Sequence, residues 1–83
     1  MRILVREHAI DRAMDENRFY KSRPTTREKA RKGIVRAVEF SFLLKLNPDG
    51  SELRGHNGKI YVCRNKKGSK IVYTILKSSR LVD

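Results

Sequence analysis

The sequence predicts an α+β fold, in which two N-terminal helices pack on a small antiparallel sheet of three or four strands. The first observation that supports this prediction is a change in the spacing of the apolar residues. Apolar residues recur at helical spacing before residue 40 and alternate with other residues, as in a strand, after it. The second is length, because 83 residues provide one domain, 1–83, with a modest core.

The first helix is predicted over residues 6–17. Residues 1–5 before it fit either a short strand or a lead into the helix. Four residues form the apolar stripe of this helix: Ala9, Ile10, Ala13 and Met14. His8 and Arg12 fall one turn apart on its polar side.

The second helix is predicted from about Thr25 to Glu39. Pro24 blocks a helix through the basic segment 18–27. Thr25 is followed three residues later by Glu28, which is the spacing of a capping box. The apolar stripe consists of Ala30, Ile34, Ala37 and Val38. Gly33 lies inside this helix at some cost in helix stability.

The C-terminal half is predicted to form the sheet. Residues 40–46 alternate as a strand, and Asn47–Gly50 has the composition of a turn. Residues 51–58 fit a polar connection that contains His56. A hairpin follows, with a four-residue loop over Asn65–Gly68.

The hairpin register assigns residues to two faces of the sheet. It pairs Arg64 with Ser69, Val62 with Ile71 and Ile60 with Tyr73, and these residues form the apolar face expected to pack on the helices. The opposite face carries Lys59, Tyr61, Cys63, Lys70, Val72, Thr74 and Leu76.

The net charge of +11 is the strongest indication of function. A small domain this basic repels itself, and binding a polyanion relieves the repulsion, so we expect a nucleic acid or an acidic protein as partner. A basic solvated surface or the charge-rich composition of a thermophile would look the same. The sequence has no apolar run long enough to cross a membrane and no signal peptide, and it has one cysteine. Together these three observations favour a cytoplasmic protein.

His8, Arg12 and Thr74 are the candidate catalytic residues. Histidine can transfer protons near neutral pH and a guanidinium can hold a phosphate, which are the two tasks of RNA cleavage through the 2′-hydroxyl. The alternative is that Glu7 and Asp11 neutralise His8 and Arg12 in surface pairs. For Thr74 the alternative is an ordinary strand residue.

A second set of residues is predicted to bind nucleic acid. It combines the basic segment 18–36, the loop around His56 and the polar face of the hairpin, where Tyr61 could stack on a base. The set is Arg23, Arg27, Lys29, Arg31, Lys32, Arg36, Arg54, His56, Lys59, Tyr61 and Lys70. We expect no metal and no cofactor, because neither metal-ligand spacing nor a glycine-rich phosphate loop is present.

The motif His8-Ala9-x-x-Arg12 and the late strand Tyr73-Thr74-Ile75 resemble a family of small bacterial and phage proteins. That family in turn resembles the barnase–EndoU–colicin–RelE class of ribonucleases. The resemblance implies helices against an antiparallel sheet and metal-independent RNA cleavage by His8, Arg12 and Thr74, with Lys70 and Tyr61 as further candidates. The chain departs from the family pattern at Glu16-Asn17-Arg18, where the family often has Glu-Arg-Gly.

Two functions are therefore favoured, and DNA binding by the basic second helix ranks below both. The first is a small RelE-like ribonuclease or toxin, for which RNA is a better partner than DNA. The second is a non-catalytic, phage-type modulator that binds a host nucleic-acid-processing protein or nucleoprotein complex. The hairpin register directs Thr74 away from the helices, so His8 and Thr74 would not meet in one site unless the register is shifted.

Overall fold

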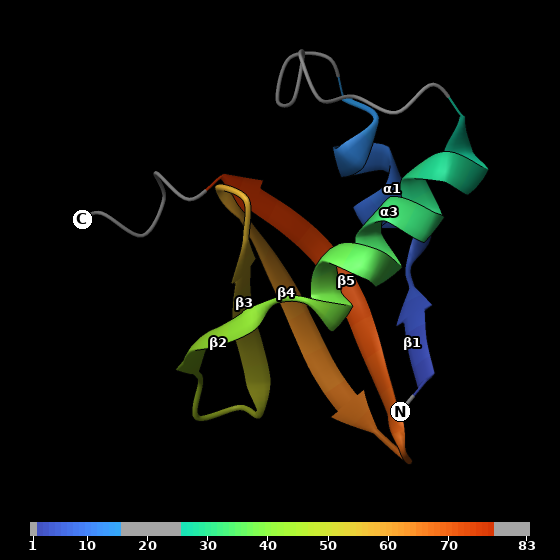
Figure 1. The fold of residues 1–83 in the computed structure, drawn as a ribbon. Helices are drawn as coiled ribbons and strands as arrows, with labels where there is room; N and C mark the ends of the chain where they lie inside the picture. The colour runs from blue at the N-terminus through green and yellow to red at the C-terminus, as the bar shows by residue number, and fades with distance from the viewer. Residues whose placement is uncertain (1, 16–25, 78–83) are drawn as a thin grey trace.

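The computed structural model describes residues 2–15 and 26–77, which form a mixed sheet with two helices (Figure 1). The elements in chain order are β1 (Arg2–Val5), α1 (Glu7–Ala13), α3 (Arg27–Glu39), β2 (Phe42–Leu46), β3 (Ser51–His56), β4 (Lys59–Lys66) and β5 (Ser69–Lys77). The strands lie in the order β1-β5-β4-β3-β2. β1 is parallel to β5, and every other neighbouring pair is antiparallel.

The predicted sheet of three or four antiparallel strands is therefore wrong. The sheet has five strands and is mixed, and a strand precedes both helices. One additional strand is β3, which occupies the segment predicted as a polar connection. The other is β1, where the structure has the strand alternative for residues 1–5. Because the connection from β1 to β5 runs through the helices and the other strands, this pair can be parallel.

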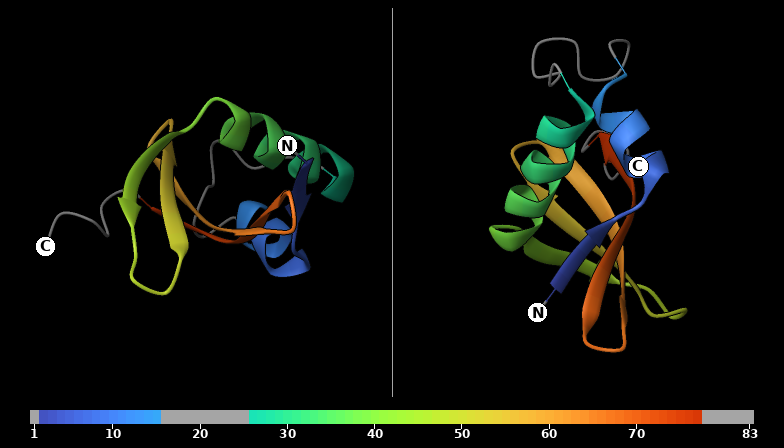
Figure 2. Two further views of the ribbon diagram at one scale, coloured as in Figure 1. Left: turned by 90° about the horizontal axis from the view of Figure 1, so that it is seen from below. Right: turned by 90° about the vertical axis from the view of Figure 1, so that its right-hand side faces the viewer.

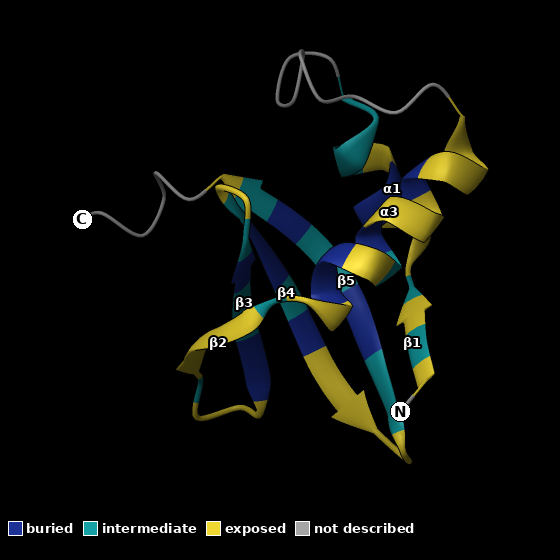
Figure 3. Ribbon diagram, in the orientation of Figure 1, coloured by how far each residue is buried: buried dark blue, intermediate teal, exposed yellow. Residues whose placement is uncertain are grey.

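The sheet is curved, and α3 lies across its concave side (Figure 2). α1 contacts both β5 and α3. The core lies between these helices and the middle of the sheet, where Figure 3 shows the buried residues. It contains Ala9, Ile10, Ala30, Ile34, Ala37, Val38, Tyr61, Cys63, Val72 and Ile75. The predicted apolar stripes of both helices thus supply one side of the core, and partly buried Ala13 and Met14 pack against it.

The cap of α3 is Thr26 and not Thr25. The Thr26 hydroxyl accepts a hydrogen bond of 3.1 Å from the backbone N–H of Lys29, which satisfies one of the donors exposed at a helix start. Thr25 lies outside the described residues. Glu28, the other member of the predicted capping box, instead accepts a hydrogen bond from Arg31.

The predicted hairpin register is also wrong, by two residues. β4 and β5 are joined by a two-residue turn at Lys67–Gly68, where both residues have positive φ (49° and 81°). A tight turn of this kind needs positive φ at both positions and matches the twist of the strands. Asn65 and Lys66 therefore continue β4, and the pairs are Lys66 with Ser69 and Arg64 with Ile71.

A bulge in β5 then changes the phase of the strand. Cys63 pairs with Val72 but Val62 pairs with Thr74, so Tyr73 is the additional residue. Tyr61 pairs with Ile75, and this pair packs against the helices. In β4, the side chains that pack against the helices are thus those that were predicted to point away from them.

Candidate nucleic-acid interface

A pocket of about 250 Å³ opens between α3 and the hairpin formed by β3 and β4. Five residues that were predicted to bind nucleic acid line it together: Lys29, Arg36, His56, Lys59 and Tyr61. The remaining lining residues are Ala13, Ala30, Gly33, Ile34, Ala37, Asn57 and Ile75. Segments that are far apart in the sequence thus place basic side chains around one pocket, which is also lined by apolar residues.

The α3 side of the pocket follows from helical spacing. Ala30, Ile34 and Ala37 are buried against the sheet, and Lys29, Gly33 and Arg36 lie one residue earlier on the same helix. They line the rim because residues three and four apart share a helix face. At Gly33 an added Cβ would meet no atom within 4 Å, so the wall of the pocket is open at this position.

The hairpin side of the pocket is built by the turn Asn57–Gly58. Both residues have positive φ, 49° and 76°, which allows β3 to reverse tightly into β4. His56 and Lys59 are the strand residues that flank the turn, and they pair with each other across it. The turn therefore fixes an imidazole and an ammonium side by side at the mouth of the pocket.

The electrostatic character of the pocket is positive. No acidic residue is among the described residues that line it. Burial lowers the pKa of Lys59 from its ordinary value, and burial raises the pKa of Tyr61 to about 12. Tyr61 therefore stays a neutral phenol at physiological pH and adds no negative charge. Only 4% of Tyr61 is exposed, which leaves little of its ring for a base to stack on.

Three further cations of α3 lie within ion-pair distance of carboxylates. Arg27 forms ion pairs with both Glu7 and Asp11 and so joins α3 to α1. Arg31 and Lys32 both lie within ion-pair distance of Glu28, at 2.7 Å and 3.9 Å. These pairs are exposed, so water and salt screen them and an incoming phosphate could compete for the cations. Arg23 lies outside the described residues.

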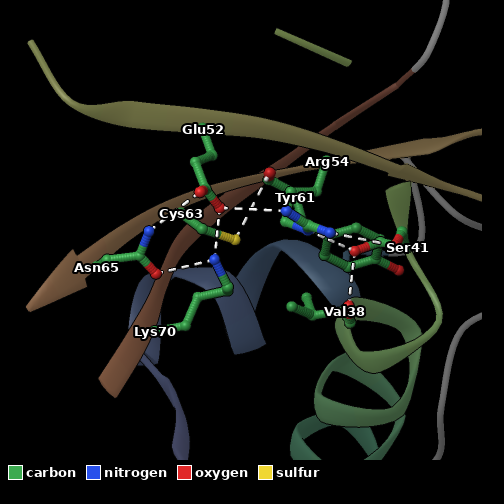
Figure 4. Close-up of polar contacts among 8 residues, drawn as sticks. All are labelled: Val38, Ser41, Glu52, Arg54, Tyr61, Cys63, Asn65 and Lys70. Carbon is green, nitrogen blue, oxygen red and sulfur yellow. Dashed lines mark hydrogen bonds and ion pairs between the residues drawn. The ribbon is translucent and has the colours of Figure 1, made fainter. Parts of the chain in front are cut away.

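Arg54 and Lys70 belong to a different arrangement, an internal network around Glu52 (Figure 4). The Lys70 ammonium and the Asn65 amide each donate to the Glu52 carboxylate, and Arg54 lies 3.4 Å from it. Arg54 also donates to the hydroxyl and the backbone carbonyl of Ser41, which follows α3. Because both cations are largely buried, at 19% and 12% exposed, this network ties β3 to β5 and to the end of α3.

Burial raises the pKa of Glu52, but the hydrogen bonds from Lys70 and Asn65 and the charges of Lys70 and Arg54 outweigh it. The net effect is a pKa below the ordinary value of 4.5. Glu52 is thus a permanent anion at neutral pH that neutralises part of its own cationic surroundings. Glu52 was not predicted to hold such a network, because Asn65 and Lys70 are distant from it along the chain.

The predicted catalytic residues do not form one site. The Arg12 Nε donates a hydrogen bond of 3.2 Å to the His8 Nε2, so these two residues do lie together on α1. Thr74, however, pairs with Val62 and points to the opposite face from its neighbour Ile75, which packs against the helices. The Thr74 hydroxyl is buried without a hydrogen-bond partner among the described residues, and neither His8, Arg12 nor Thr74 lines the basic pocket.

Gly33 and Asn57 are among the seven lining residues that were not predicted as part of a site. The Asn57-Gly58 dipeptide is a strong signal for a two-residue hairpin turn. Had it been used, it would have placed His56 and Lys59 opposite each other. Gly33 was recognised only as a weak point of the helix, and nothing in the local sequence shows that it faces an opening.

Within residues 2–15 and 26–77 no three or more His, Cys, Asp or Glu side chains are grouped so as to hold a metal ion. Neither α1 nor α3 has the length and apolar composition required to cross a bilayer. No protein-family model matches the chain, and no curated protein or solved structure matches it.

Proposed function

We propose that the chain binds the phosphate backbone of RNA through the basic pocket. The observation that carries this proposal is the convergence of Lys29, Arg36, His56 and Lys59 on one hollow that no described carboxylate lines. Phosphate contacts from Lys and Arg dominate the affinity of nucleic-acid-binding proteins. The net charge of +11 would draw a polyanion towards the pocket.

The shape of the site supports a single strand over duplex DNA. The cations gather in a pocket bordered by α3 and the β3–β4 turn, and not along the exposed face of a helix of the kind that enters a major groove. A concave site of this size suits a flexible strand, which can direct one phosphate inward. The single cysteine is buried and free, which supports the cytoplasmic location that we propose for this binding.

The test is the affinity for a labelled single-stranded RNA of about ten nucleotides, measured by fluorescence anisotropy at several salt concentrations. Arg36→Ala and His56→Ala should each weaken binding, and Arg36→Ala should also lower the salt slope by about 0.7. Lys66→Ala removes an equal charge from an exposed strand position outside the pocket and serves as the matched control. Equal losses for all three variants, or an affinity that does not change with salt, would refute the proposal.

RNA cleavage is a second candidate, carried by the position of His56 beside three cations in the pocket. Such a site has a proton-transfer group next to groups that can stabilise a negatively charged phosphorane. Incubation of labelled RNA in EDTA with the native chain, His56→Ala and His8→Ala separates the alternatives. Cleavage lost only in His56→Ala assigns it to the pocket, and cleavage lost only in His8→Ala assigns it to the His8–Arg12 pair. If the RNA stays intact with the native chain, binding without cleavage is the function that remains. A non-catalytic modulator is expected to behave in the same way.

A further inference from the structure

The basic pocket is closed at its inner end by the core. Its lining includes Ala30, Ile34 and Ile75, which are only 2%, 3% and 1% exposed. The helix α3 and the β3–β4 hairpin form two of its walls, and Ala13 lines it from α1, which contacts α3 (Figure 1). A strand of nucleic acid therefore cannot run through the pocket towards the sheet, and a group that fills it must reach in from the mouth.

The volume of the pocket limits what can reach in. At about 250 Å³, it lies just below the roughly 300–1,000 Å³ of pockets that enclose a drug-sized molecule. An internal phosphate of a nucleic acid can enter deeply only if the nucleotides on both of its sides follow it. A phosphate at the end of a strand brings one nucleotide only, so the size of the pocket favours a strand end.

The positively charged side chains border the pocket on two sides. Lys29 and Arg36 belong to α3, whereas His56 and Lys59 belong to the hairpin. An internal phosphodiester carries one negative charge. A terminal phosphomonoester carries about 1.5–2 negative charges at pH 7 and has three strong acceptor oxygens. Donors that approach from two sides therefore match the terminal group better than an internal one.

Gly33 leaves open the space between the two cations of α3. It lies four residues after Lys29 and three residues before Arg36, and all three residues line the pocket. An added Cβ at Gly33 would meet no atom within 4 Å. The two cations start about 10 Å apart along the helix axis, and their long side chains can both turn towards a group that lies against Gly33.

The hairpin side of the pocket favours a dense negative charge. His56 and Lys59 are half-buried and pair with each other across the turn. Burial lowers the pKa of Lys59, because its charged form is less well solvated there than in water. An anion in the pocket would stabilise this charged form, and a doubly charged anion would do so more than a singly charged one.

We propose that the basic pocket recognises a terminal phosphomonoester of single-stranded RNA. This inference rests on the RNA binding proposed above, and it adds that the end of the strand is the part that enters the pocket. The same chemical group occurs at a 5′ end and at a 3′ end, and the experiment distinguishes the two. The remaining nucleotides of the strand lie outside the mouth.

The test compares RNAs of one sequence, about ten nucleotides long and labelled on an internal base, by fluorescence anisotropy. One RNA has hydroxyls at both ends, one has a 5′-phosphate and one has a 3′-phosphate. A hydroxyl-ended RNA that is two nucleotides longer has about the same total charge as the phosphorylated RNAs and serves as the control for charge alone. We expect one phosphorylated RNA to bind about tenfold more tightly than this control, and its identity shows which end is recognised.

Variants of the pocket show whether the preference arises there. Arg36→Ala and His56→Ala should largely abolish the tenfold preference, whereas Lys66→Ala, outside the pocket, should keep it. Phosphorylated RNAs that bind no more tightly than the longer control would overturn the inference. The proposed function would then still stand if Arg36→Ala weakens the binding of every RNA more than Lys66→Ala does. A preference that survives in both folded pocket variants would also overturn the inference.

A second measurement needs no variant. Adenosine 5′-monophosphate and adenosine 3′-monophosphate carry the same terminal group, and each is titrated into the isotope-labelled native chain. The amide NMR signals of Gly33 and Asn57, which line the pocket, should shift with the nucleotide that matches the preferred end. Those of Gly50 and Gly68, which lie in other turns and do not line it, should stay unchanged. Shifts confined to residues outside the pocket, or no shift up to about 10 mM nucleotide, would overturn the inference.

Discussion

Lys70 on β5 and Glu52 on β3 form an ion pair across the intervening strand β4. Both side chains are 12% exposed. Asn65 of β4 donates to the same carboxylate and accepts from the same ammonium, so each of the three strands contributes one member. This triad lies on the sheet face that packs against the helices, where Glu52 pairs with the core residue Cys63.

Replacement of Glu52 should therefore be costly. Glu52→Gln keeps the shape of the side chain but leaves Lys70 and Arg54 without their anion, and we expect a loss of about 2–3 kcal/mol in the free energy of unfolding. Urea denaturation measures it. Glu28→Gln removes an equally charged but exposed carboxylate and should leave stability almost unchanged. If both variants lose the same stability, the triad has no special role in holding the strands together.

The same carboxylate should make stability depend on acid pH. The pKa of Glu52 is lowered in the folded chain from its ordinary value of 4.5, so its contribution is complete above that value and is lost as pH falls through the folded pKa. Denaturation midpoints between about pH 7 and about pH 3 should show this fall, and Glu52→Gln should reduce it. Parallel curves for the native chain and the variant would contradict this assignment.

Two substitutions at Gly33 distinguish an effect on helix stability from an effect on access to the pocket. Gly33→Ala should stabilise the chain by about 0.5–1 kcal/mol, because alanine favours a helix interior and its Cβ meets no neighbour. Gly33→Leu places a large side chain at the pocket wall and should weaken RNA binding several-fold without unfolding α3. Thermal unfolding and anisotropy measured on both variants test this. An unchanged affinity in a folded Gly33→Leu variant would argue that RNA binds elsewhere.

The two tight turns provide a matched pair of substitutions. Gly58→Ala and Gly68→Ala both force alanine into positive φ, at 76° and 81°, and each should destabilise the chain by about 1–2 kcal/mol. Only Gly58 adjoins His56 and Lys59 at the pocket, so only Gly58→Ala should also reduce the affinity for RNA. The ratio of the two affinities, measured where both variants are folded, checks this expectation.

Local signals predicted the helices better than the sheet. The stripe Ala30, Ile34, Ala37 and Val38 is complete within α3, and all four residues are buried as predicted. β3 was missed because Glu52 and Arg54 give it a polar appearance. Their partners, Lys70 and Ser41, come from other parts of the chain and are not visible from local composition.

The hairpin shows why register is hard to predict. Asn65 and Gly68 both favour loops, which suggested a four-residue connection, but Lys67 adopts positive φ and shortens the turn to two residues. The bulge at Tyr73 then changes which residues of β5 face the core. The grouping of Lys29, Arg36, His56 and Lys59, in contrast, does not depend on that register, because these residues come from α3 and the other hairpin.

The parallel pairing of β1 with β5 has a consequence for how the chain is made. Arg2 pairs with Ser69, so among the described residues the partner of β1 is the strand that follows all the others in the chain. The hairpins β2–β3 and β3–β4 can form earlier from neighbouring segments, whereas the edge at β1 must close a long loop. β1 therefore has no strand partner until β5 has been synthesised, and only then can the sheet be completed.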